Sequence, residues 1–166
     1  MPLLNYTTEI PATKSIAEIT RILQEGGASA IMLENGVDRE IVAVSFILVT
    51  TFGRVPFRIP ANIPAVILAL NSQIREEGKK RGPRKIPLRL FNNKEQAERI
   101  AWRIAKDWLE AQMAIHTIGS AKLEQIMLPF ADAGNGQSFY DRIVQRGSLS
   151  LPAPSDGVEP KNVTDV

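Results

Sequence analysis

Residues 39–50, with the sequence REIVAVSFILVT, decide the fold of this chain. Apolar or β-branched side chains occupy both alternate sets of positions in this run. They are Ile41, Val42, Val44, Phe46, Ile47, Leu48 and Val49. Such a pattern is typical of a strand that is covered on both sides. We therefore expect residues 39–50 to form the central strand of a sheet.

The segments on either side of this strand predict an antiparallel meander. Asn35-Gly36 is a hairpin turn signal, because both residues tolerate a positive φ, and it joins a strand at residues 28–34 to the central one. After a second turn, residues 55–59 alternate in polarity, and Pro56 makes them an edge strand. With a short first strand at residues 4–9, the sheet would have three or four strands.

Two helices are expected to flank the meander. In the first, Ser15 and Glu18 fit a capping box, and the glycines at 26 and 27 end the helix. Asn62 opens the second helix. Residues 76–90 contain two glycines and two prolines, so we expect an exposed loop there.

The longest helix is expected between Asn93, a cap residue, and Gly119. Its buried seam would be a seven-residue repeat of Ala97, Ala101, Ile104, Trp108, Ala111, Ile115 and Ile118. A second apolar row lies beside it: Trp102, Ala105, Leu109 and Met113. Because two rows offer more apolar surface than a small sheet can cover, Trp102, Leu109 and Met113 are a candidate oligomer interface. The alternative is that they belong to the core of one chain.

The fold class that follows is α+β, a three- to four-stranded antiparallel meander packed against two helices and one long helix. The 166 residues divide into a single domain at 1–146 and a tail at 147–166. The tail is rich in Ser, Pro, Gly and Asp, so we expect it to be disordered.

The net charge of +2 conceals an uneven distribution. Residues 41–94 carry ten basic and two acidic side chains, a balance of +8, whereas the segments on either side are each at −3. The candidate phosphate-binding residues are Arg54, Arg58, Lys79, Lys80, Arg81, Arg84, Lys85 and Arg89. Clustered cations of this kind suit nucleic-acid backbones, and the alternative is a loop that is only solvated.

Residue types that support catalysis or metal binding are sparse. Cysteine is absent, and His116 has no partner at the spacing of metal ligands. Glu34, Asp38 and Glu40 flank a turn, where solvation explains them better than a cation site does. We therefore expect no catalytic residues, no metal and no cofactor, and an enzyme is the least favoured class.

Neither a signal peptide nor a membrane span is expected. Met1 to Glu9 lacks a basic start and a long apolar stretch, and the apolar run at 41–49 is far shorter than a bilayer requires. A cytoplasmic location follows as the prediction.

One stretch, AWRIAKDWLEAQ at residues 101–112 followed by IMLPF at 126–130, resembles a family of small uncharacterised proteins encoded by bacteriophages and prophages. YTTEI at 6–10 and FRIPA at 57–61 are similar to the same family. The resemblance implies a phage context in a bacterial host and carries no activity with it.

Two hypotheses for function follow. The first is a non-catalytic nucleic-acid-binding accessory protein that contacts phosphates, DNA or RNA, through the basic loop at 76–90. The second is a protein- or small-ligand-binding module, such as an inhibitor or sequestering protein aimed at a host protein. It would form a homo-oligomer through the helix that carries Trp102.

Overall fold

A computed structural model of the chain describes residues 2–79, 82, 86–134 and 136–147. In these residues the elements follow in the order α1 (Ala12–Glu25), β1 (Ala30–Asn35), β2 (Ile41–Thr50), β3 (Gly53–Pro60), α2 (Ile63–Gly78), η1 (Leu88–Leu90), α3 (Lys94–Thr117), α4 (Leu123–Met127), η2 (Leu128–Phe130) and α5 (Phe139–Gln145). The α+β class is thereby confirmed, and the predicted tail from residue 148 onward lies outside the described residues.

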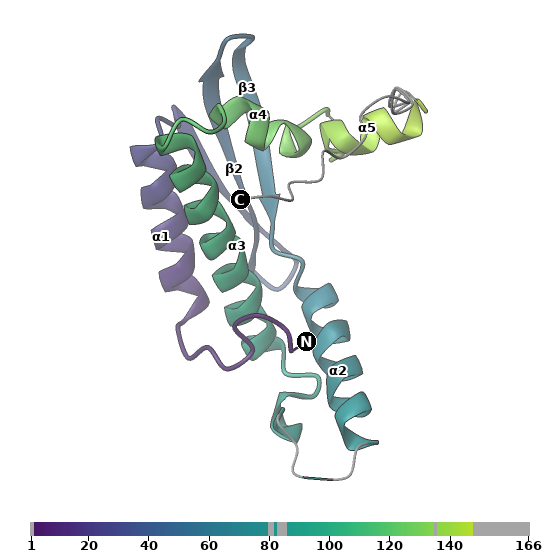
Figure 1. Cartoon of the computed structure of the whole chain (residues 1–166). Coiled ribbons are helices and arrows are strands. Elements are labelled where there is room, and N and C mark those ends of the chain that lie inside the picture. Colours follow the sequence, from purple (N-terminus) through teal and green to yellow (C-terminus); the bar gives the residue numbers. More distant parts are fainter. Residues whose placement is uncertain (1, 80–81, 83–85, 135, 148–166) are drawn as a thin grey trace, which may run out of the picture.

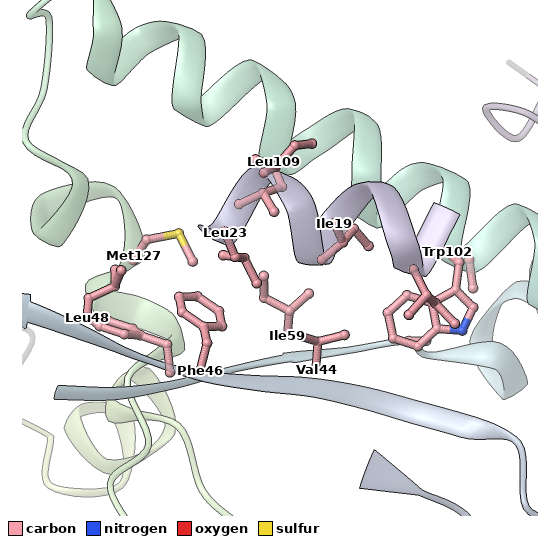
Figure 2. Packing of buried hydrophobic residues seen from close by; sticks show 14 of the residues in the cluster. Ile19, Leu23, Val44, Phe46, Leu48, Ile59, Trp102, Leu109 and Met127 are labelled. Atoms are coloured by element: carbon pink, nitrogen blue, oxygen red, sulfur yellow. The ribbon is translucent and has the colours of Figure 1, made fainter. Parts of the chain in front are cut away.

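The sheet has three antiparallel strands in the order β1-β2-β3, with β2 in the centre as the sequence predicts. α1 and α3 lie together over one face of it (Figure 1). On that face every second residue of β2 is buried, and Phe46 is paired with Phe57 of β3 at a ring distance of 5.6 Å. Figure 2 shows Ile19 and Leu23 of α1 between this strand and α3. This is the main core of the molecule.

The expectation that β2 is covered on both sides was wrong. The second face of the sheet is largely open: Met32 is 60% exposed and Val49 is 70% exposed. Only α1 and α3 lie against the sheet over its length, because α2 runs away from the end of β3 and packs along the first half of α3 (Figure 1). On this side of β2, Val49 therefore borders solvent, whereas Ala43 is buried and Ile41 and Ile47 are half-buried.

The predicted first strand at residues 4–9 was wrong as well. These residues form turns, with Asn5 at a φ of 60°, and the carbonyl oxygens of Tyr6 and Thr8 accept hydrogen bonds from the Gln96 side chain at 3.1 and 2.9 Å. A polar side chain of α3 thus binds the backbone groups that a sheet partner would have used.

The capping box predicted at Ser15 was also wrong. α1 begins one turn earlier, after Pro11, whose fixed φ of −58° suits the residue before a helix. Ser15 is fully buried, and its hydroxyl has no partner among the described residues. Glu18 instead accepts a hydrogen bond from Arg103 on α3 at 3.0 Å. The helix start predicted at Asn62 and the cap predicted at Asn93 are confirmed, since each side chain accepts a backbone N–H of its helix.

The predicted seven-residue seam of α3 is confirmed only at its start, where Ala97 and Ala101 are buried in the core. Trp102 and Leu109, from the second apolar row, are 1% and 0% exposed, while Ile118 of the predicted seam is 75% exposed. Trp102 and Leu109 therefore fill the core of one chain (Figure 2) and leave no surface for an interface. Met113 is half-buried against the same core. Trp102 and Leu109 are therefore not available to a partner chain, and an interface at Met113 stays a prediction.

The loop predicted at residues 76–90 is partly structured. α2 continues through Gly78, and η1 returns the chain toward α3. Ile86 and Leu90, at 1% and 7% exposure, pack on Ile74 in a small cluster separate from the main core. We call the described residues 71–79 and 86–93 the arm.

The last elements close one edge of the sheet. Ala131 forms an isolated bridge with Phe57, and the Asp132 N–H donates to the Pro56 carbonyl oxygen at 2.9 Å. Ser138 caps α5 in a capping box with Asp141. These backbone contacts hold the chain after η2 beside β3.

Candidate nucleic-acid interface

The basic segment at residues 79–89 begins and ends in the arm. Of its six predicted cations, Lys80, Arg81, Arg84 and Lys85 lie outside the described residues. Lys79, at the end of α2, and Arg89, in η1, are both exposed. The Lys79 ammonium contacts the Glu76 carboxylate at 2.7 Å, in a pair that is exposed on both sides. Water screens such a pair strongly, so it does little to restrain Lys79.

The two ends of this segment are fixed close together. The Ile86 N–H donates to the Glu77 carboxylate at 2.8 Å, and the Ile86 side chain packs against Ile74 one turn earlier in α2. The chain therefore leaves α2 and comes back to it at the same place.

An amide pair joins the two segments of the arm at its base. The Asn71 side chain accepts the Asn92 backbone N–H at 3.0 Å and donates to the Asn92 side-chain oxygen at 2.5 Å. Asn92 has a φ of 53°, a left-handed conformation that Asn adopts more readily than most residues. Because Asn71 is only 9% exposed, water cannot easily replace these bonds.

Arg75 belongs to this surface, and the sequence analysis missed it. Arg75 is exposed, and its guanidinium lies 5.5 Å from the centre of the Phe91 ring, within cation–π distance. Residues 75 and 79 are one helical turn apart, so Arg75 and Lys79 lie on the same face of α2. The signal was available, but reading residues 76–90 as a loop hid the helical spacing.

Arg54 and Arg58 do not extend the same surface. Both lie on β3, before the start of α2, whereas Lys79 follows the end of that helix, whose 16 residues span about 24 Å. Arg54 is exposed next to the β2–β3 turn, with one long hydrogen bond of 3.5 Å to Ser29. The predicted cations are thus divided between the arm and the open face of the sheet.

Arg58 is moreover paired within the chain. Its Nε donates to both oxygens of the Glu34 carboxylate at 3.2 and 3.0 Å, and its Nη2 lies 2.9 Å from Oε2. The Ser45 hydroxyl also donates to Glu34. These hydrogen bonds, from Arg58 first and then from Ser45, lower the pKa of the Glu34 carboxyl below its usual 4.5. Because Glu34 stays ionised, Arg58 has little charge to offer a phosphate.

The carboxylates near the first hairpin do not gather around a cation site. Asp38 and Glu40 pair with Lys94 at 2.7 and 3.4 Å, while Glu34 points to Arg58. In the part of the chain that the structure describes, no three His, Asp or Glu side chains come together as metal ligands would. The His116 ring lies 3.2 Å from the Ala121 carbonyl oxygen, beyond the end of α3.

Across the described residues, no helix combines the length and the apolar character that crossing a bilayer requires. Comparison with known proteins gives no relative: no family model, no curated protein and no solved structure matches this chain. The resemblance to a phage-encoded family therefore stays a prediction.

Proposed function

We propose that this protein is a non-catalytic nucleic-acid-binding accessory protein that contacts phosphates through the end of the arm. The observation that carries the proposal is the concentration of positive charge in one short segment of the sequence. Residues 75–89 hold seven basic and two acidic side chains, a balance of +5, in a chain whose total is +2. Lys and Arg side chains that neutralise phosphates release counterions, which favours binding without base-specific geometry.

The arrangement of the described residues supports this function in two ways. Arg75, Lys79 and Arg89 are all exposed, so their charged groups can reach a ligand without any rearrangement of the core. Of the two acids in the segment, Glu77 accepts a hydrogen bond from the Ile86 N–H, so part of the negative charge of Glu77 faces the backbone of the arm. Arg58 is left out of the proposed surface, because Glu34 balances its charge.

The test replaces Lys79, Lys80, Arg81, Arg84 and Lys85 together by Ser and measures the binding of fluorescein-labelled 20-nucleotide probes, single-stranded and duplex, by anisotropy. We expect the natural chain to bind both at about 50 mM salt and to lose affinity steeply by about 200 mM. The variant should bind at least about tenfold more weakly, with a shallower dependence on salt, because fewer counterions are released.

A matched control removes the same number of cations elsewhere. Lys14, Arg21, Lys122, Arg142 and Arg146 are exposed on α1, before α4 and at the end of α5, and their replacement by Ser gives the same net charge as the arm variant. This control should keep most of the affinity. The proposal fails if the natural chain binds neither probe at the low salt concentration, or if both variants lose affinity equally.

A further inference from the structure

A pocket of about 300 Å³ lies beside β3, between this strand, η2 and the start of α5. Its apolar lining includes the rings of Phe130 and Tyr140, and its polar lining includes Arg58, Asp132 and Asp141. A pocket with apolar walls and a few polar groups is the usual form of a small-ligand site. Nothing in the nucleic-acid function of the arm uses it.

The walls of the pocket are fixed before any ligand arrives. The Phe139 N–H donates to the Ala131 carbonyl oxygen at 2.7 Å, and the Gly134 N–H donates to Oδ1 of Asp132 at 2.8 Å. The Phe130 ring is held by Trp108 of α3 at a ring distance of 4.9 Å. Little ordering free energy would therefore oppose binding.

The charge in the pocket is negative. The Glu34 carboxylate already balances Arg58, so Asp132 and Asp141 set the sign. Hydrogen bonds from the hydroxyl and the N–H of Ser138 lower the pKa of Asp141, which keeps it ionised at neutral pH. Both bonds use Oδ2 of Asp141, and the bond to Asp132 uses Oδ1, so one oxygen of each carboxylate has no partner among the described residues.

We propose that this pocket binds an organic cation: an ammonium or guanidinium group attached to an apolar or aromatic body. The rings of Phe130 and Tyr140 contact the body and attract the positive charge through their faces. Asp132 and Asp141 supply the opposite charge. A phosphate would be repelled here, so this site is separate in chemistry and in position from the arm.

The experiment follows backbone amide shifts in ¹H–¹⁵N spectra of the whole chain during titration with phenethylamine and agmatine, with phenethyl alcohol as the neutral match. We expect both amines to shift amides of residues 130–134 and 136–141, and the alcohol to bind at least tenfold more weakly. Asp132→Asn combined with Asp141→Asn should weaken amine binding at least tenfold. Asn keeps the oxygens that accept from Gly134 and Ser138, so the variant should retain its fold.

Asp38→Asn is the matched control, because Asp38 is an exposed carboxylate paired with Lys94 and distant from the pocket lining. It should leave amine binding unchanged. An acetylated, amidated Pro-Arg dipeptide distinguishes the source of the cation: tighter binding than agmatine identifies a peptide side chain, and equal or weaker binding identifies a free amine. The proposal is overturned if neither amine shifts these amides, if the alcohol binds as well as phenethylamine, or if the double variant binds amines unchanged.

Discussion

The body of the molecule and its arm are stabilised in different ways. The body, formed by the sheet with α1 and α3, has a continuous apolar core drawn from every one of these elements. The arm has a cluster of only three buried residues: Ile74, Ile86 and Leu90. In addition to this small apolar cluster, hydrogen bonds of the Asn71 and Glu77 side chains stabilise the arm. The proposed binding surface therefore belongs to the part of the chain with the smaller apolar core, where local unfolding requires the least free energy.

The largest effect is expected from removing the centre of the body. Trp102 is 1% exposed on α3, and Trp102→Ala should lower the free energy of unfolding by about 3–5 kcal/mol, because it leaves a large cavity. Urea denaturation followed by far-UV circular dichroism measures the change. Trp108→Ala is the matched control on the same helix: Trp108 is half-buried against Phe130, so its loss should be clearly smaller. Equal losses would show that the body has no single centre at Trp102.

The second largest effect is expected from a substitution that destabilises the arm and leaves the stability of the body unchanged. Asn71→Ala leaves the Asn92 N–H without its partner in a site that is nearly closed to water, at a cost of about 1–3 kcal/mol. Hydrogen exchange should show faster exchange in the arm, while the amides of β2 keep their protection. Ser72→Ala, at an exposed position of the same helix, is the control and should change neither. If β2 loses protection together with the arm, the two regions unfold as one unit.

The same contrast explains what the sequence could predict. The strands and helices of the body follow from local apolar periodicity and from turn and cap residues, so β2, the helix start at Asn62 and the cap at Asn93 were predicted correctly. The hairpin between β1 and β2 is present as well, but Asn35 ends β1 and the positive φ is at Arg39. The stripe of α3 that faces the core was predicted only in part, since Ala97 and Ala101 of the repeat are buried but so are Trp102 and Leu109 of the second row. Local periodicity does not tell which of two apolar rows packs against the rest of the chain.

The arm and the open face were harder to predict for a related reason. Glycine and proline in residues 76–90 suggest a loop, and only the long-range contact of Ile86 with Ile74 reveals buried positions there. For the candidate site, the excess of basic residues could be counted from the sequence. That Glu34 neutralises Arg58 depends on strand register, with Arg58 opposite Ser45, and a sequence alone does not fix it.

The smallest effect on stability is expected from the ion pair between Glu34 and Arg58 on the open face of the sheet. Their side chains are 26% and 35% exposed, and the bonds are bidentate, so Glu34→Gln should cost about 1 kcal/mol at pH 7. The folded-state pKa of Glu34 is below 4.5, so its contribution is present above about pH 4.5 and is lost as the pH falls through the folded-state value. The difference in unfolding free energy between the natural chain and the variant should therefore shrink toward zero in acid.

Urea denaturation at a series of pH values from 7 down to 3 measures this difference. Glu95→Gln is the control, since Glu95 is 75% exposed and its bond to Arg99 joins two residues on one helix surface, where such pairs contribute at most a few tenths of a kcal/mol. A difference for Glu34 that stays constant over the whole pH range would mean that the loss comes from packing of the altered side chain. The open face of the sheet would then be stabilised by apolar contacts, as the covered face is. Hydrogen bonds of polar side chains would be important for the stability of the arm only.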